Sequence, residues 1–211
     1  MTAAGMTAPP TPPMTRREFL YYIWAASMAL FTAEYGGAIV WFALPRFKAG
    51  EFGGKFTLDV SVIPAVDSGP AEFPDGRFWL VNLGPKRKSD PRQPADYPVE
   101  EGVVAIYKVC VHLGCLYKWV PVNDRFECPC HGSKYLVTGS RVDGPATRNL
   151  DVFIMEAQDD SGTPLAKTQS GNSGEPGVGA PFKLPEGATK IVVNTGARIQ
   201  GGPNTKPGGG R

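Results

Sequence analysis

The chain contains the segments Cys110-Val111-His112-Leu113-Gly114-Cys115 and Cys128-Pro129-Cys130-His131-Gly132-Ser133, separated by twelve residues. Together they hold every cysteine and both histidines of the 211-residue chain within a window of 22 residues. Thiolates and imidazoles bind soft and borderline metal ions. The sequence therefore predicts one metal centre, formed by two short loops that each contribute cysteine and histidine.

The number and type of ligands discriminate between metals. A structural zinc site needs only four of the six groups, and its usual spacings, C-x(2–4)-C and H-x(3–5)-H, differ from mixed Cys/His loops. A 2Fe–2S centre of the Rieske type needs two thiolates on one iron and two imidazoles on the other. A framework of disulfides would leave both histidines without a purpose. The iron–sulfur interpretation is favoured over both alternatives, and it leaves one pair of thiols outside the ligand set.

The pattern C-x-H-L-G-C…C-P-C-H-G-S-x-Y resembles that of the Rieske iron–sulfur protein of cytochrome bc-type quinol oxidases, over about 36 residues that end at Pro145. The resemblance implies a Rieske-type 2Fe–2S cluster as cofactor. Position by position, Cys110 and Cys128 would bind the inner iron. His112 and His131 would bind the outer iron.

The same resemblance assigns roles to neighbouring residues. Cys115 and Cys130 match the pair that forms a disulfide between the two loops, a bridge that is missing from the low-potential Rieske ferredoxins of oxygenases. Ser133 and Tyr135 match hydroxyls that hydrogen-bond the cluster sulfurs in high-potential members. Such donors stabilise the more negative reduced cluster and raise its potential. Gly144-Pro145 resembles the proline loop that covers the cluster from a third side.

A long apolar run near the N-terminus predicts a membrane anchor. Phe19–Leu44 holds 26 residues with one acidic side chain and no basic one. As a helix it would reach about 39 Å, enough to cross a bilayer core with some tilt. A cleaved secretory signal is the alternative, but the run is long for an h-region, and Ala43-Leu44-Pro45 is a poor cleavage site. An uncleaved transmembrane helix is therefore favoured.

The acid in this run, Glu34, calls for a separate interpretation. An acidic side chain near the middle of a span costs about 2.5–3.5 kcal/mol on insertion scales and commonly faces protein or water. The adjacent Gly36-Gly37 would permit close approach of another helix. A role in helix–helix packing is favoured over proton conduction.

Thr15-Arg16-Arg17-Glu18-Phe19-Leu20 directly precedes the run and resembles the twin-arginine export signal. The two arginines could also be the positively charged flank of the span, and both interpretations can hold together. Export of folded cargo suits a cluster that is inserted in the cytoplasm, and a disulfide persists in oxidising compartments. We therefore expect a single-pass protein of a bacterial plasma membrane, with a cytoplasmic N-terminus and an extracytoplasmic domain.

The chain after the span predicts a mainly β domain. Short β-rich runs alternate with turn formers, and no convincing amphipathic helix of ten residues follows the span. The runs are Phe56–Ile63, Arg77–Leu83, Val103–Val109, Phe126–Cys128, Leu136–Val137, Leu150–Glu156 and Lys190–Thr195. The resemblance implies a Rieske-type antiparallel β-sandwich with an inserted cluster-binding subdomain. Gly84–Gly102 and Gln158–Ala180 are expected to be surface loops.

These observations divide the chain into five segments. We expect a disordered cytoplasmic N-terminus with the twin-arginine-like motif at 1–18, a transmembrane helix at 19–44, a flexible hinge at 45–56, a Rieske domain at 57–200 with its cluster-binding subdomain at about 103–147, and a disordered tail at 201–211. The prolines of the N-terminus and the glycines of the hinge and tail support the assignment of the flexible parts.

The resemblance also implies a function. The chain would be a redox subunit of a quinol–cytochrome c oxidoreductase-type complex, dimeric and containing a cytochrome b-type membrane subunit. It would accept an electron from membrane quinol and pass it to a c-type cytochrome or a similar acceptor. A histidine bound to iron through one ring nitrogen can use the other nitrogen to collect the quinol proton. His131 is favoured for this role over His112, and Leu113 is expected to contact the membrane subunit.

Other function classes receive less support. A net charge of +2 is too small to suggest nucleic-acid binding. One alternative is the Rieske small subunit of a molybdenum oxidase such as arsenite oxidase, which would relay electrons without quinol proton chemistry. A non-redox membrane protein with a structural zinc site is the other.

Overall fold

The structure is a computed structural model that describes residues 13–44, 52–94, 99–168 and 181–203. The chain forms two compact units, Met1–Arg46 and Phe47–Arg211. The expected disordered N-terminus up to residue 12, the hinge from 45 to 51 and the tail from 204 lie outside the described residues.

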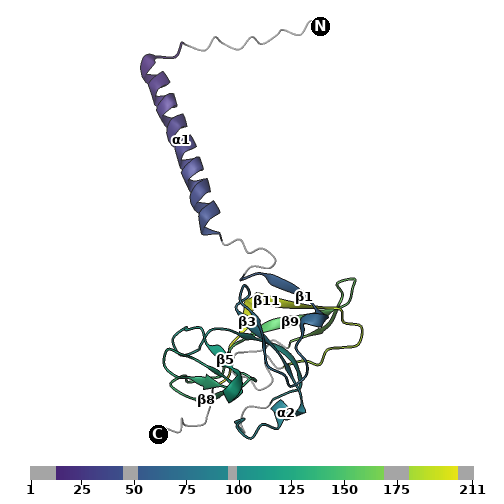
Figure 1. The fold of residues 1–211 in the computed structure, drawn as a ribbon. Coiled ribbons are helices and arrows are strands. Elements are labelled where there is room, and N and C mark those ends of the chain that lie inside the picture. The colour runs from purple at the N-terminus through teal and green to yellow at the C-terminus, as the bar shows by residue number, and fades with distance from the viewer. Residues whose placement is uncertain (1–12, 45–51, 95–98, 169–180, 204–211) are drawn as a thin grey trace, which may run out of the picture. The chain divides into compact units, whose positions relative to one another are not determined.

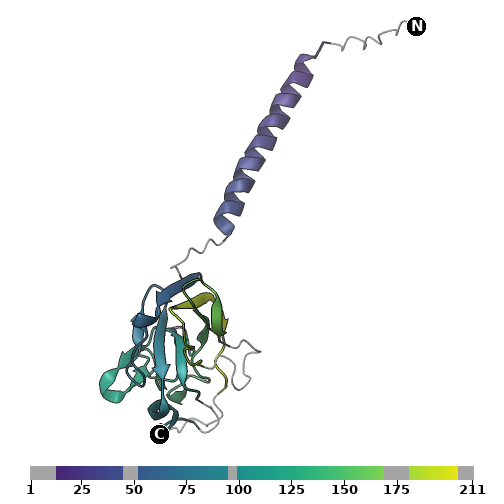
Figure 2. The ribbon, with the colours of Figure 1, turned by 90° about the vertical axis from the view of Figure 1, so that its right-hand side faces the viewer.

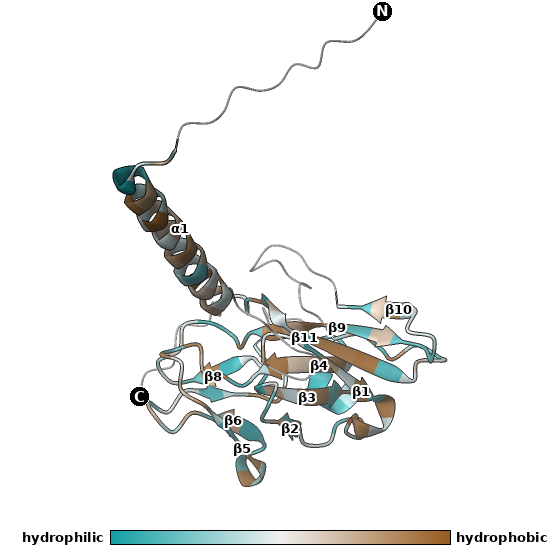
Figure 3. Cartoon of the chain, turned by 90° about the horizontal axis from the view of Figure 1, so that it is seen from above, coloured by the Kyte–Doolittle hydropathy of each residue, from teal (hydrophilic) through white to brown (hydrophobic). Residues whose placement is uncertain are grey.

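The first unit contains one long helix, α1 (Arg16–Ala43) (Figure 1). It begins at a capping box, in which Thr15 accepts a hydrogen bond from the backbone of Glu18 and the Glu18 carboxylate accepts one from the backbone of Thr15. Its 28 residues span about 42 Å. The helix is long and apolar enough to cross a membrane, and Figure 3 shows hydrophobic residues along most of its length. The predicted apolar N-terminal helix is therefore present.

The second unit is built from two antiparallel sheets (Figures 1 and 2). The larger, curled sheet has the order β1 (Lys55–Asp59), β11 (Lys190–Ile199), β9 (Val152–Gln158), β4 (Gly102–Tyr107), β3 (Phe78–Leu83) and β2 (Ala71–Phe73), with β10 (Pro164–Lys167) paired to β9. The smaller sheet has the order β5 (Lys118–Val120), β6 (Arg125–Glu127), β7 (Lys134–Tyr135) and β8 (Arg141–Asp143). Short helical turns lie at η1 (Val60–Val62), α2 (Pro85–Lys88) and η2 (Pro121–Asn123). The mainly β prediction is confirmed.

The larger sheet buries both of its faces. On β3, Phe78 and Leu80 belong to one core, while Trp79 and Val81 belong to another, as the two-residue period of a strand requires. The first core is filled mostly by residues of the larger sheet itself. The second core also contains residues of the smaller sheet, such as Phe126. The smaller sheet is thus packed against the larger one through a shared apolar core.

A network of ion pairs joins the segment after β3 to the smaller sheet. The carboxylate of Asp67 accepts hydrogen bonds from the backbone N–H groups of Gly84, Lys86 and Arg87 and so fixes α2. The buried guanidinium of Arg87 then pairs with Asp124, in the turn between β5 and β6. This pair fixes the position of the β5–β6 hairpin relative to the larger sheet.

Several details differ from the sequence-based expectations. The strand expected at Leu136–Val137 was wrong: the strand is β7, and Leu136 instead donates from its backbone to Ser140 in a tight turn. The expected surface loop Gly84–Gly102 contains the buried side chains of Arg87 and Val99. The other expected loop, Gln158–Ala180, contains β10, which pairs with β9.

Candidate metal centre

Two loops with the same backbone closure form the candidate site. Loop 1 (Cys110–Cys115) follows β4, and loop 2 (Cys128–Ser133) follows β6. In loop 1, the first residue donates its backbone N–H to the carbonyl of the sixth at 2.7 Å, and the fifth donates to the carbonyl of the first at 3.0 Å. In loop 2, the corresponding distances are 2.8 and 3.0 Å. Each loop is therefore held in one shape by its own main chain.

The glycine at the fifth position of each loop is required by this shape. Gly114 has φ +83° and Gly132 has φ +76°, in the left-handed region that L side chains rarely adopt. The left-handed residue turns the chain back so that its N–H reaches the first cysteine of the loop. This explains in physical terms why a glycine follows the predicted ligand residues in both halves of the motif.

The loops bring the predicted ligands together. Cys110 and Cys128 are buried free thiols. The rings of His112 and His131 have centroids 4.8 Å apart in an edge-to-face arrangement. His112 is half-buried, whereas His131 is exposed. The centre therefore has thiols on its inner side and an imidazole at the surface.

The remaining two cysteines are bonded to each other. Cys115 of loop 1 and Cys130 of loop 2 form a disulfide, as the sequence predicts. The Sγ of Cys128 lies within 4.8 Å of both of their sulfurs. Because those two sulfurs are bonded to one another, they are not available as metal ligands. The disulfide ties the loops together beside the free thiols.

The residues at this centre fit a 2Fe–2S cluster with two thiolate and two imidazole ligands. The Nδ1 atom of His112 is buried and has no hydrogen-bond partner among the described residues, which is a costly arrangement unless a metal ion binds it. Burial raises the pKa of the Cys128 thiol, and the neighbouring Cys110 raises it further, while the backbone N–H groups of Cys130 and His131 lower it. Two thiols so close together are suited to bind a metal as thiolates.

The two predicted hydroxyls lie behind the thiols. The buried Tyr135 hydroxyl is 3.2 Å from the Sγ of Cys110, within hydrogen-bond distance. The Oγ of Ser133, also buried, accepts a hydrogen bond from the backbone N–H of Ala146 at 3.2 Å. Ser133 thus connects loop 2 to the segment that follows Pro145, in addition to the role predicted for it at the cluster sulfurs.

The Gly144-Pro145 segment lies directly against loop 2. A Cβ at Gly144 would be 2.4 Å from the Cα of Ser133 and 2.7 Å from the carbonyl oxygen of Gly132. Gly144 also has φ +90°. Only glycine allows this approach, and the segment therefore forms a third wall beside the two loops.

Two further features bear on the site. Leu113, at the tip of loop 1, is 69% exposed and is not part of either core. Tyr117, which the sequence did not single out, is completely buried beside Tyr135. Its sequence signal is weak, because an aromatic residue just after a loop is indistinguishable from an ordinary core residue.

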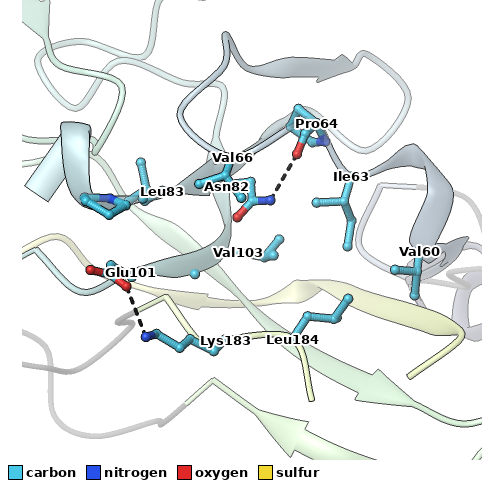
Figure 4. Close-up of a pocket in the computed structure, with 13 residues that line it drawn as sticks. Val60, Ile63, Pro64, Val66, Asn82, Leu83, Glu101, Val103, Lys183 and Leu184 are labelled. Atoms are coloured by element: carbon cyan, nitrogen blue, oxygen red, sulfur yellow. Dashed lines mark hydrogen bonds and ion pairs between the residues drawn. The ribbon is translucent and has the colours of Figure 1, made fainter. Parts of the chain in front are cut away.

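A cavity of about 420 Å³ lies elsewhere in the domain, between η1, the end of β3 and the segment at Lys183-Leu184 (Figure 4). Its walls are mostly apolar, with Asn82 fixed by a hydrogen bond to the carbonyl of Pro64 and an ion pair between Glu101 and Lys183. None of the predicted ligands lines this cavity, so it is separate from the metal centre.

A mainly β domain with two disulfide-linked loops, each offering one free thiol and one imidazole, defines a class of iron–sulfur electron carriers. Comparison with known proteins agrees: residues 89–154 match the family model described as the Rieske [2Fe-2S] domain. The chain belongs to the Rieske iron–sulfur protein family. Its cofactor is a Rieske-type 2Fe–2S cluster, and its role is electron transfer.

Similar proteins include iron–sulfur subunits of cytochrome b6-f complexes. The cytochrome b6-f complex iron-sulfur subunit 1 of Synechocystis sp. (strain ATCC 27184 / PCC 6803 / Kazusa) is 33% identical over 162 residues, which cover 72% of this chain and 84% of that protein. The cytochrome b6-f complex iron-sulfur subunit 3 of Nostoc sp. (strain PCC 7120 / SAG 25.82 / UTEX 2576) is 31% identical over 158 residues, with the same coverage, 72% and 84%.

Among solved structures, the cyanobacterial plasma membrane Rieske protein PetC3 from Synechocystis PCC 6803 is 27% identical, with a TM-score of 0.29, over 46% of this chain and 81% of that chain. The long apolar helix α1 supports single-pass membrane anchoring of this chain.

Proposed function

We propose that this chain is the Rieske subunit of a cytochrome bc-type complex. It accepts an electron from membrane quinol, with transfer of a proton, and passes the electron to a c-type cytochrome or a similar acceptor. The observation that carries the proposal is the layered centre, with buried thiols and hydroxyls inside and an exposed imidazole at the surface. When bound, the cluster supplies one-electron redox chemistry.

The ligand assignment is part of the proposal. Cys110 and Cys128 hold one iron through their Sγ atoms, and His112 and His131 hold the other through ring nitrogens. For His112 the buried Nδ1, which has no hydrogen-bond partner among the described residues, supports a role as the ligand atom. The disulfide between loops 1 and 2 keeps the two halves of this ligand set at a fixed spacing.

The proton of quinol is collected by an imidazole at the rim of the site. We assign this role to His131, because its side chain is exposed whereas His112 is half-buried. A ring nitrogen of His131 that is not bound to iron accepts the hydrogen bond of the quinol hydroxyl and then holds its proton. The exposed Leu113, which follows His112 in loop 1, contacts the membrane subunit that binds the quinol.

The division of the chain into anchor, hinge and domain is also proposed. The transmembrane helix at 19–44 holds the protein in a bacterial plasma membrane, with the N-terminus in the cytoplasm and the Rieske domain, 57–200, outside. The hinge at 45–56 lets the domain alternate between the quinol site and the cytochrome. Within that hinge, the ring of Phe52 stacks on Tyr107, and Lys55 and Phe56 pair with β11, so the described residues of this segment belong to the domain.

The complex that the chain joins contains a cytochrome b-type membrane subunit and a c-type cytochrome, and it is dimeric. The similarity to b6-f iron–sulfur subunits over 84% of their length supports this choice. It favours the quinol-oxidising complex over the small subunit of a molybdenum oxidase such as arsenite oxidase.

The proposal is tested in membranes from cells that lack this chain and are complemented with it. Wild-type chain should restore quinol–cytochrome c reduction that a cytochrome bc inhibitor abolishes. His131→Ala should lower that rate at least tenfold, while Val122→Ala, at an exposed turn away from the ligands, should leave it unchanged. Restoration of arsenite-dependent cytochrome reduction, without quinol oxidation, would instead assign the chain to a molybdenum oxidase.

A further inference from the structure

Tyr117 lies directly behind the metal centre and belongs to neither loop. It follows loop 1 by two residues and immediately precedes β5. Its side chain is 0% exposed and lies in the core shared by the two sheets. Burial raises the pKa of its hydroxyl well above the ordinary value for tyrosine, so the group remains a neutral hydrogen-bond donor.

The hydroxyl of Tyr117 links the two chain segments that enter and leave loop 1, which we call the neck of the loop. It donates a hydrogen bond of 2.7 Å to the carbonyl oxygen of Tyr107, the last residue of β4 and only three residues before Cys110. The neighbouring pair Val109 and Leu116 forms an isolated β-bridge across the same neck. The side chain of Tyr117 therefore adds one more cross-connection, below the loop that carries Cys110.

The ring of Tyr117 supports Tyr135. The centroids of these two rings are 5.9 Å apart, and the ring of Phe126 packs against Tyr117 from another side at 5.1 Å. Tyr135 is in β7, and its hydroxyl is the group that lies 3.2 Å from the Sγ of Cys110. The position of this hydroxyl thus depends on the wall that Tyr117 provides for the Tyr135 ring.

We propose that Tyr117 is a positioning residue of the metal centre. Its hydroxyl anchors its ring to the end of β4, and its ring holds the Tyr135 hydroxyl on the Sγ of Cys110. The proposal rests on the proposed function only in taking Cys110 as an iron ligand. It assigns to Tyr117 an effect on the redox potential that is exerted entirely through Tyr135.

The expected effect follows from the strength of hydrogen bonds to cluster ligands. A donor aimed at a ligand sulfur stabilises the reduced state and raises the potential. The hydrogen bond weakens steeply when its length or angle changes. A side chain that leaves space beside Tyr135 should therefore lower the potential, by an amount no larger than removal of the Tyr135 hydroxyl itself.

The experiment uses the full-length, cluster-containing protein in detergent and compares Tyr117→Leu, Tyr117→Phe, Tyr135→Phe and the double variant Tyr117→Leu/Tyr135→Phe. The midpoint potential is measured by redox titration followed by EPR, and thermal unfolding is recorded in parallel. Trp79→Phe is the matched control, because Trp79 packs on Phe126 in the same core. It should lower the unfolding temperature without a shift in potential.

We expect Tyr117→Leu to lower the potential in the same direction as Tyr135→Phe, and Tyr117→Phe to lower it less, because the ring is kept. In the double variant, the potential should equal that of Tyr135→Phe alone. Additive shifts, or a lower unfolding temperature with an unchanged potential, would overturn the proposal. If Tyr117→Leu does not retain its cluster, Tyr117→Phe decides: an unchanged potential contradicts the positioning role.

These outcomes are distinct from those that test the proposed function. Absence of a Rieske-type EPR signal in the wild-type protein would refute the ligand assignment. A normal wild-type signal with unresponsive Tyr117 variants would refute only the positioning role.

Discussion

At the scale of single residues, the hydroxyl of Ser133 interacts with two neighbouring groups. Its buried Oγ accepts the backbone N–H of Ala146, and its hydroxyl also forms a side-chain hydrogen bond with Tyr135. The hydroxyl therefore couples the shape of loop 2 to the segment that covers the centre. These two interactions explain why serine, rather than another small residue, follows the glycine of loop 2.

Ser133→Ala should therefore reduce stability as well as potential. The buried N–H of Ala146 loses its acceptor, which should cost about 1–3 kcal/mol in the free energy of unfolding. Urea unfolding of the full-length protein measures this cost. Ser161→Ala is the control, since Ser161 also forms hydroxyl hydrogen bonds but is exposed. Equal unfolding midpoints for Ser133→Ala and wild type would contradict the assigned contact.

Glycine is required at the centre for two different reasons: a left-handed backbone at Gly132, and a close approach to loop 2 that leaves no room for a Cβ at Gly144. Substitution by alanine separates these two reasons. Gly132 needs only its left-handed backbone, because a Cβ there would meet no described atom within 4 Å. Gly132→Ala should cost about 1–2 kcal/mol from conformation alone. Gly162, at φ +84° and with equally open surroundings, provides a matched control outside the site.

Gly144→Ala should be far more damaging. Its Cβ would overlap the backbone of loop 2, so the loop has to move and the ligand spacing changes. We expect iron content per chain to fall strongly in Gly144→Ala and to be retained in Gly132→Ala and Gly162→Ala. Similar iron contents in all three variants would show that the third wall is not needed to hold the cluster.

At the scale of elements, the pair between Arg87 and Asp124 connects the segment after β3 to the β5–β6 hairpin. The side chain of Arg87 is 5% exposed, while that of Asp124 is 38% exposed. Hydrogen bonding to Arg87 lowers the pKa of the Asp124 carboxyl, although its burial acts in the opposite direction. The hairpin carries β6, which leads into loop 2, so this pair helps to position the second half of the metal centre.

The lowered pKa gives the pair a defined pH dependence. Asp124 contributes stability at pH values above its unfolded-state pKa of about 3.9, and this contribution is lost as the pH falls through the lower folded-state pKa. Arg87→Met should therefore reduce the free energy of unfolding near neutral pH, by less than the roughly 3–5 kcal/mol typical of a fully buried pair.

The difference between Arg87→Met and wild type should shrink as the pH is lowered below about 3.9. Denaturant unfolding between about pH 7 and pH 2.5 measures it. Lys183→Met, which removes an exposed partner of Glu101, serves as control and should have a small effect throughout. A difference that stays constant down to the lowest pH would mean that Arg87 acts by packing and not by charge.

At the scale of the whole molecule, the sequence predicted the metal centre in more detail than the fold around it. The two loops of the centre could be predicted because rare residue types recur in a fixed pattern, and the disulfide followed from the resemblance. The long helix could be predicted because an apolar run of 26 residues is compatible with few structures. These features are local in sequence, and each depends on a residue composition that occurs at one place in the chain.

The parts that sequence reasoning missed depend on contacts between distant residues. Strands β2, β5 and β8 have three residues each, too few for an alternating pattern to be recognised. The burial of Arg87 depends on Asp124, which is 37 residues away. The importance of Tyr117 likewise depends on its position beside Tyr135, which only the packing of the two sheets creates.

The attachment of Phe52 and its neighbours to the domain has a mechanical consequence. The ring of Phe52 stacks on Tyr107 and lies under the guanidinium of Arg77, while Gly53 and Gly54 are hydrogen-bonded to Thr195 on β11. A pull on the chain before Phe52 is therefore met first by these contacts and by the β1–β11 ladder. Force applied there would enter the larger sheet at β1 and β11, whereas the two predicted ligand loops follow β4 and β6, so load and ligands would be carried by different strands of the domain.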